Sequence, residues 1–426
     1  MSNKNGIIAL SPLIVLILVY LSTSIIAHDF YAIPITITFL IASIYSICIS
    51  TKYPIKRRIE IFNRGAGNSN LLLMVWIFIL AGAFANSAKA MGCIDSTVNL
   101  TLSLLPDNLL YAGLFLASCI ISLSIGTSVG TIVALVPIAM GIGNTINQNI
   151  PMLIAIVIGG SFFGDNLSFI SDTTIVSTST QGCKLNDKFR VNSYIVFPVA
   201  TIVFLLYLII GNNANYSHPQ SDINVVNIIP YIAVLVTAIL GMNVMAVLTL
   251  GIILTGVIGV SEGAYDFFQW LKTLGDGIVS MGELIIVTIL AGGLLEMIKE
   301  NGGIDYIIKK IMGHVHSKSG AEFSISVLVS LVNVCTANNT VAIITVGDIA
   351  KKISDRYGID NRKSASLLDT FSCVVQGILP YGAQILMASG LSKVNPIHFI
   401  GYLYYPFLLG IFALLSIYFR YPKKFS

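Results

Sequence analysis

Charged residues are scarce in this sequence. Only 10% of the 426 residues are Asp, Glu, Lys or Arg, whereas 55% are hydrophobic. A soluble protein of ordinary composition carries about 25% charged residues, so a soluble globular fold is excluded. The basic residues gather in short segments between apolar runs, and the formal net charge of +4 therefore gives no indication of a nucleic-acid partner.

Cysteine and histidine are also rare. The six cysteines form no CxxC pair, and most of them lie inside apolar runs, so we expect buried thiols in place of disulfides or a metal centre. His314 and His316 could bind a metal, but a solvated loop pair is the simpler interpretation. Because no histidine falls inside a predicted membrane segment, the sequence argues against a histidine proton relay.

Long apolar runs are abundant. Examples are Ile7–Ala27, Ile33–Ser50, Leu71–Ala90 and Val191–Gly211, each long enough to cross a bilayer as a helix. The first run is longer than the apolar region of a signal peptide, and no small-residue cleavage site follows it. The composition and these runs predict an all-α polytopic membrane protein.

The chain contains an internal repeat. Residues Ile79–Asp95 match Ile289–Asp305 at a constant offset, and the shared residues include a lysine and an aspartate in each copy. The segment TSVGT (Thr127–Thr131) echoes TANNT (Thr336–Thr340) more weakly at nearly the same offset. Duplication of this kind is common in transporters. We predict two membrane repeats, 1–212 and 213–426, joined by the polar stretch 211–227.

Each repeat holds six hydrophobic units, and the positive-inside rule selects their topology. If the fourth unit of each half is a re-entrant hairpin, five units cross and the second half is inverted. With a cytoplasmic N-terminus, this arrangement puts the expected basic loops at 52–64 and 184–190 inside. It leaves only Lys272 and Lys393 outside, with Lys89 at a helix end, whereas twelve full crossings would put many more basic residues outside. The sequence therefore predicts ten spanning helices, two re-entrant hairpins in inverted repeats, and cytoplasmic N- and C-termini.

Small and polar residues mark the two predicted hairpin tips. Non-helical backbone at membrane depth persists only where protein or a water-filled cavity satisfies it. These residues either cap the hairpin helices, contact the transported solute, or do both. The candidate substrate contacts are Thr127, Ser128, Thr131, Thr336, Asn338, Asn339 and Thr340.

Three acidic residues, Asp165, Asp172 and Asp369, lie deeper in apolar segments than the others. A carboxylate at the bilayer centre costs roughly 2.5–3.5 kcal/mol on insertion scales. The sequence places no basic residue to neutralise them, since Lys184 and Lys363 lie at segment ends, so we expect a proton or a bound cation to do so. The predicted cation- and proton-binding residues are Asp165, Asn166, Ser168, Ser171, Asp172, Thr173 and Asp369, with Asp165 and Asp172 as Na⁺ ligands.

Both acid-bearing units are predicted to be discontinuous helices. Glycines precede Asp165, and the polar residues after it compete with helical hydrogen bonding, so that Ser171 or Asp172 could cap a second half-helix. Asp172 could also serve as a cap alone, and Asp369 could be a proton-entry or gating acid near the cytoplasmic mouth. In the second half, Gly377, Pro380 and Gly382 break the helix, and the polar groups offered there are Gln376, Tyr381 and Gln384.

The stretch GGSFFGDNLSFISDTT (Gly159–Thr174) resembles the signature FFGD-(N/K)-x-S-P-(I/L)-S-D-T-T of the NhaC-type Na⁺/H⁺ antiporter family. It departs from that pattern at Phe169, where the family commonly has proline. The segments that begin at Thr336 and Ser364 are also similar to the second half of this family. More distantly, polar hairpin tips beside broken helices resemble the ion-transporter superfamily that includes divalent-anion/sodium symporters. The resemblance implies secondary active transport, with Na⁺ leaving and H⁺ entering the cell.

We therefore expect a Na⁺/H⁺ antiporter of the bacterial inner membrane that exchanges cytoplasmic Na⁺ for external H⁺ at buried aspartates. The alternative is a Na⁺- or H⁺-coupled transporter or exchanger of a small organic acid or amino acid; the lack of a deep arginine favours a cation. An enzyme is not expected, because the GLGD motif of intramembrane aspartyl proteases is absent. The expected partners are Na⁺, H⁺ and the lipid bilayer, with no cofactor and no nucleic acid. A homodimer is one candidate assembly, although the sequence is silent on oligomeric state.

Overall fold

The computed structural model describes residues 3–27, 34–104, 106–169, 171–211, 224–240, 242–312 and 317–425. These residues form helices and connecting turns, without a β-strand among them. The predicted all-α class is therefore confirmed. His314, His316, Ile170 and most of the predicted linker 211–227 lie outside the described residues.

Helices follow one another in the same order in both halves of the chain. The first half contains α1 (Asn3–Ala27), α2 (Ile35–Ile49), α3 (Ile55–Ala66), α4 (Ser69–Ala90), α5 (Cys93–Leu104), the short 3-10 turn η1 (Asp107–Leu109), α6 (Leu110–Ile125), α7 (Ser128–Thr145), α8 (Ile150–Leu167), α9 (Asp172–Gln181) and α10 (Leu185–Gly211). The second half contains α11 (Val225–Ile239), α12 (Val244–Ser261), α13 (Phe267–Ser280), α14 (Gly282–Glu300), α15 (Gly303–Met312), α16 (Lys318–Thr336), α17 (Asn339–Tyr357), α18 (Asn361–Ile378), α19 (Ala383–Ser392), α20 (Pro396–Ile400) and α21 (Tyr404–Tyr418). The main difference is that α20 and α21 together take the place of α10.

Many of these helices have the length and composition of membrane spans. Within the described residues, 8 helical stretches are long and apolar enough to cross a bilayer, and α8–α9 and α18–α19 are among them. Shorter apolar helices add Gly6–Tyr20, Thr36–Ile49, Leu110–Ser124, Val225–Thr237 and Tyr404–Tyr418. The chain is a multi-pass membrane protein, as its composition predicts.

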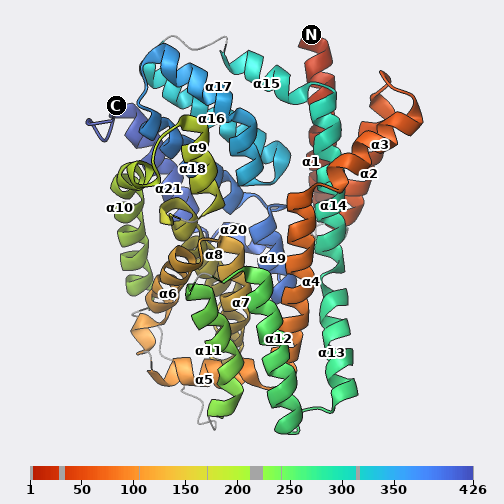
Figure 1. The fold of residues 1–426 in the computed structure, drawn as a ribbon, viewed down its shortest axis with the longest axis vertical. Coiled ribbons are helices and arrows are strands. Elements are labelled where there is room, and N and C mark those ends of the chain that lie inside the picture. The colour runs from red at the N-terminus through yellow and green to blue at the C-terminus, as the bar shows by residue number, and fades with distance from the viewer. Residues whose placement is uncertain are drawn as a thin grey trace.

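The two halves are inverted relative to each other. Figure 1 shows α3, α15 and the hairpin α16–α17 at the end of the molecule that carries both termini. The corresponding α13, α5 and hairpin α6–α7 lie at the opposite end. Because each counterpart occupies the other end, the predicted inverted repeat is confirmed.

Two reciprocal glycine contacts follow from this symmetry. Gly65 of α3 lies against the backbone carbonyl of Gly292 in α14, and Gly82 of α4 lies against that of Gly277 in α13. A Cβ atom at any of these positions would collide with the facing helix, so only glycine permits the backbones to approach this closely. Helix α3 therefore packs against α14 in the same way that α13 packs against α4.

The basic segment that contains α3 was expected to be a loop, and that expectation is wrong. Its apolar residues recur at helical spacing, with buried Ile61 and Gly65 on one face. On its polar side, Arg64 forms ion pairs with Glu296 at 2.7 Å and Glu300 at 3.2 Å. Packing against α14 thus makes this segment a helix, although its many charges suggest a solvent-exposed loop.

The repeated sequence 79–95 and 289–305 folds into the same helix–turn–helix in both halves. Gly92 and Gly302 each end the first helix with a positive φ, 79° and 80° respectively, a conformation that glycine adopts without strain. The weaker match at the hairpin tips had the wrong register. The equivalent left-handed residues are Gly126 and Ala337, so that Thr127 corresponds to Asn338 and not to Thr336.

The core of the molecule surrounds α8. This helix is buried from Met152 to Leu167 without interruption, and it contacts α6, α7, α10 and α18. A carboxylate on its last turn is therefore held far from bulk water. Asp165 occupies that turn.

Candidate cation site

The helix that carries the first two acids is interrupted, as predicted. Helix α8 ends at Leu167 and α9 begins at Asp172, and the caps Ser168 and Ser171 between them have extended backbone with ψ of 140° and 137°. Phe169 lies between these caps, and its ring stacks on Phe189 of α10 with a centroid distance of 4.8 Å. This aromatic contact packs the connection between α8 and α9 against α10.

The glycines before Asp165 do not interrupt the helix, contrary to expectation. They allow α8 to pack closely on its neighbours: a Cβ at Gly164 would collide with Ser122 of α6. The hydroxyl of Ser122 donates to the carbonyl of Ser161 in the same contact. The glycine-rich approach therefore fixes the position of α8 and leaves its helical hydrogen bonds intact.

The interruption leaves backbone carbonyls at the end of α8 without helical partners. Side chains replace those partners. Thr173 donates its hydroxyl to the carbonyl of Asp165 at 3.2 Å, and Lys188 and Asn192 of α10 donate to the carbonyl of Asn166 at 2.7 and 2.9 Å. The polar residues after the break thus satisfy the backbone groups that the break exposes.

The carboxylate of Asp165 is bound to the tip of the first hairpin. Its Oδ2 accepts the hydroxyl of Ser128 at 2.6 Å, and its Oδ1 accepts the backbone N–H of the same residue at 3.1 Å. Ser128 begins α7, and the N-cap residue Thr127 makes no side-chain cap bond. Asp165 therefore caps α7 from a neighbouring helix, where a negative charge is favoured by the helix dipole.

A short chain of side chains connects this contact with the second half. Gln384 donates to the Ser128 hydroxyl at 2.9 Å, and Gln376 donates to Gln384 at 2.9 Å. Gln376 also donates to the carbonyl of Ala337 at the second tip, at 3.0 Å. The two hairpin tips and the two interrupted helices thus meet in one polar network.

A cavity of about 360 Å³ opens beside this network. The apolar side chains Leu73, Met74 and Ile77 of α4 form part of its wall, opposite residues of both tips and of α9. Of the residues predicted to bind cation or solute, those that line it are Asp165, Ser171, Asp172, Thr173, Thr127, Ser128, Asn338, Asn339, Thr340 and Gln384.

The other predicted site residues do not line this cavity. Asn166 donates to the carbonyl of Phe162, and Ser168 donates to that of Leu123. Thr131 and Thr336 bond backbone carbonyls within their own tips. Tyr381 donates to the carbonyl of Val334, which holds α16 near the second break.

Residues of the second tip both cap a helix and line the cavity. Asn338 is the N-cap of α17, and its side chain accepts the backbone N–H of Val341 at 2.9 Å. Its side chain nevertheless borders the cavity together with Asn339 and Thr340. Capping therefore leaves these residues at the cavity, and their contact with a solute stays a prediction.

The third acid is paired with a lysine. Asp369 of α18 lies 2.9 Å from the ammonium of Lys188, and both side chains are almost completely buried, with 0% and 1% exposed. Asn192 donates to the same carboxylate oxygen at 2.8 Å. The expectation that no basic residue neutralises the deep acids is therefore wrong for Asp369.

The sequence does not predict this ion pair, because Lys188 belongs to a basic cluster that resembles a cytoplasmic loop. The structure instead places it in the first turn of α10, on the buried face that Asn192 and Val199 share. The spacing of four residues between Lys188 and Asn192 was the available signal, since such residues lie one above the other on a helix.

The two halves differ at the position of Asp165. Asp165 and Gln376 occupy equivalent places in the last turns of α8 and α18. One is a carboxylate that contacts the first tip, and the other is an amide that contacts the second. The inverted repeat therefore places a carboxylate at this position in the first half and a neutral amide in the second.

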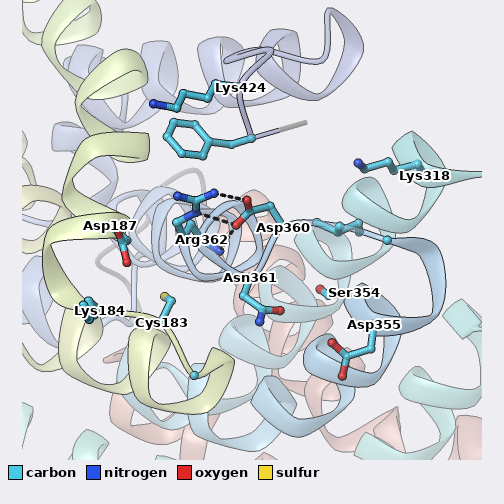
Figure 2. Close-up of a pocket in the computed structure, with 14 residues that line it drawn as sticks. Cys183, Lys184, Asp187, Lys318, Ser354, Asp355, Asp360, Asn361, Arg362 and Lys424 are labelled. Carbon is cyan, nitrogen blue, oxygen red and sulfur yellow. Dashed lines mark hydrogen bonds and ion pairs between the residues drawn. The ribbon is translucent and has the colours of Figure 1, made fainter.

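A second and larger cavity, of about 810 Å³, lies among α9, α10, α17, α18 and the C-terminal residues (Figure 2). We call it the vestibule. Arg362 binds the carboxylate of Asp360 there at 2.6 and 2.9 Å and lies 4.6 Å from the ring of Phe425. This guanidinium holds the pKa of Asp360 below its usual value. The lining combines lysines with aspartates and contains none of the deep acids.

These features define a membrane transporter: inverted halves bring two hairpin tips and two interrupted helices together around a buried carboxylate. Its family follows from comparison with known proteins. The model of the Na⁺/H⁺ antiporter family matches residues 4–212 and, separately, residues 213–423. The chain belongs to the Na⁺/H⁺ antiporter family.

Individual relatives are distant but extend over most of the chain. The chain is 25% identical to the Na⁺/H⁺ antiporter NhaC of Bacillus subtilis, over 84% of its own length and 85% of the relative's. It is 20% identical to the malate-2H⁺/Na⁺-lactate antiporter of the same organism, over 84% and 83% of the two lengths. Among solved structures, the YdaH transporter of Alcanivorax borkumensis is similar with a TM-score of 0.44 and 13% identity, covering 86% of this chain and 88% of that one.

Proposed function

We propose that this antiporter exchanges cytoplasmic Na⁺ for external H⁺, and that the two ions compete for Asp165. The observation that supports this most strongly is the placement of the carboxylate. Asp165 is 4% exposed, borders the cavity between the two hairpin tips, and forms no ion pair within the described residues. A buried carboxylate without a basic partner needs a cation or a proton for neutrality.

The groups around Asp165 suit a small hard cation. Such ions prefer oxygen ligands, and the carboxylate of Asp172 and the hydroxyls of Ser171 and Thr173 border the same cavity. A proton on Asp165 removes the negative charge that attracts Na⁺. Competition at one carboxylate is then sufficient for exchange, provided that the empty, charged site reorients slowly because its desolvation is costly.

The orientation in the membrane follows from the basic residues. Both termini lie at one end of the molecule, together with α3, α15 and the hairpin α16–α17 (Figure 1). Positively charged connections favour the cytoplasm, so we assign that end to the cytoplasm of a bacterial cell and the membrane to its inner membrane.

The decisive experiment uses everted membrane vesicles. Respiration acidifies their interior, and addition of Na⁺ should dissipate the pH gradient by releasing H⁺ in exchange. Vesicles from cells that lack the protein provide the background. A gradient that is unaffected by Na⁺, Li⁺ and K⁺ would reject cation/proton antiport.

A second candidate is Na⁺- or H⁺-coupled exchange of a small organic acid or amino acid. It is favoured by the size of the cavity, about 360 Å³, which exceeds the space that one ion needs. The amides of Asn338, Asn339 and Gln384 could bind such a solute, and one relative is named as a malate/lactate antiporter. Malate, lactate and amino acids should be added in the same vesicle assay; a solute-dependent pH change would identify this mode.

A further inference from the structure

The buried lysine Lys188 has surroundings that resemble those of a bound metal ion. Its ammonium contacts three oxygens from three helices: the carbonyl of Asn166 at 2.7 Å, the hydroxyl of Thr174 at 2.6 Å and the carboxylate of Asp369 at 2.9 Å. A carbonyl, a hydroxyl and a carboxylate are the ligands that proteins offer to hard cations. The three N–H groups of the ammonium match these three acceptors.

Residues around this position also carry unpartnered oxygen atoms. The second carboxylate oxygen of Asp369, and the amide oxygens of Asn166 and Asn192, are buried and have no hydrogen-bond partner among the described residues. An ordinary structural ion pair would be expected to use its buried acceptors. We call the three oxygens that surround the ammonium the cage; two of the residues that supply it, Asn166 and Asp369, thus retain unused acceptors.

The cage and the cavity adjoin the same helix break. Asp165 lines the cavity, and its neighbour Asn166 directs its carbonyl to Lys188. Thr174 of the cage also contacts Asp165, because its hydroxyl donates to the backbone carbonyl of that residue at 3.4 Å. Neither Lys188 nor Asp369 is among the cavity-lining residues.

We infer that the ammonium of Lys188 permanently fills a second cation position, whose ligands are the three oxygens that surround it. The protein thereby supplies the positive charge that Asp369 requires. Asp165 remains as the buried carboxylate beside the cavity for a mobile ion. This inference extends the proposed function. It rests on that proposal only because it takes Asp165 as the carboxylate that binds the mobile ion.

The inference predicts that removal of the lysine side chain creates a Na⁺ site. Lys188→Ala should leave the oxygens in place and make room for an ion with water. We would test this in an Asp165→Asn background, which removes the mobile-ion carboxylate. The measurement is the melting temperature of the purified full-length protein in detergent, in NaCl and in choline chloride of equal ionic strength.

Asp165→Asn alone should melt at the same temperature in both salts. Adding Lys188→Ala should lower the melting temperature in choline and produce a saturable rise of several degrees with Na⁺, because a ligand that binds only the folded state stabilises it. A further Asp369→Asn should abolish that rise. Lys188→Arg is the matched control, because it keeps the charge and should not create a Na⁺ response.

The inference is overturned if Lys188→Ala shows no Na⁺-dependent rise, or if the rise survives Asp369→Asn. Should the Lys188→Ala variant fail to fold in choline, its monodisperse fraction in size-exclusion chromatography should recover when Na⁺ is present during purification. Loss of the fold in both salts also overturns it. Thermal shifts need no transport, so a failure of Na⁺/H⁺ exchange in vesicles would reject the proposed function without changing this result.

Discussion

Asp165 caps the hairpin helix α7 through Ser128, with 2.6 Å between the carboxylate and the hydroxyl and 3.1 Å between the carboxylate and the backbone N–H. This contact joins the last turn of an interrupted helix to the tip of a re-entrant hairpin. An ion that binds Asp165 must share or replace these two hydrogen bonds. We therefore expect ion binding at Asp165 to affect the position of the hairpin.

Asp165→Asn should reduce Na⁺-dependent collapse of the pH gradient in everted vesicles to the background level. Asparagine preserves size and can still accept hydrogen bonds, but it carries no charge to bind Na⁺ or H⁺. The matched control is Asp95→Asn, because Asp95 is an exposed carboxylate in the first turn of α5. Full activity of Asp165→Asn at normal expression would remove this residue from the site.

Ser128→Ala should weaken the apparent affinity for Na⁺ by roughly 10- to 100-fold, the usual effect of removing a group that positions a ligating carboxylate. The backbone N–H contact with Asp165 remains, so some activity should persist. The measurement is the Na⁺ concentration for half-maximal collapse of the pH gradient. Thr145→Ala, at the far end of the same helix, should leave that concentration unchanged; an equal effect of both variants would argue against a role of the tip.

The hairpin tips and the helix breaks of this site could be predicted from the sequence, but the contacts between them could not. Hydroxyls, amides and acids within apolar runs are costly in a bilayer, and for that reason the hairpin tips and both helix breaks could be identified. The aspartate at 165 and the tip residue Ser128 were recognised separately. Their contact depends on how α7 packs on α8, which a pattern along one segment does not specify.

The parts that escaped prediction depend on contacts between distant segments. The sequence around Lys188 predicts a loop. Its burial in a helix depends on Asp369, which comes from the other half of the chain. The glycines near Gly164 were assigned to a break, although their function is close packing on α6. Helix α3 was not predicted, because its apolar face packs mainly against α14 of the other half of the chain.

Two glycines of α13 provide a test of the helix packing that the repeat creates. Gly277→Ala should lower the melting temperature in detergent by several degrees, because its Cβ would meet the carbonyl of Gly82 and overpacking costs about 1–3 kcal/mol. Gly275→Ala, on the same helix, meets no atom within 4 Å and should be neutral or slightly stabilising, since alanine favours helices over glycine by about 1 kcal/mol. Equal effects would contradict the close approach of α4 and α13.

The vestibule contains a cysteine whose reactivity depends on pH. Burial, with the negative charges of Asp187 and Asp360 nearby, raises the pKa of Cys183 to about 11. The thiolate is the reactive form, so alkylation should be slow at pH 7 and should accelerate about tenfold per pH unit up to that pKa. Maleimide labelling of a variant that retains only this cysteine measures the rate. A rate at pH 7 equal to that of an unperturbed thiol, whose pKa is about 8.5, would contradict the burial of Cys183.

Cysteine labelling can also test which side of the membrane each hairpin faces. Asn147, at the base of the first hairpin, and Arg356, at the end of the second, are both exposed. In a cysteine-free background, a membrane-impermeant maleimide should label Asn147→Cys in intact cells and Arg356→Cys only in everted vesicles, because the two hairpins enter from opposite ends (Figure 1). Labelling of both positions from one side would exclude inverted hairpins, whereas a complete exchange of the two sides would keep the fold and reverse its orientation in the membrane.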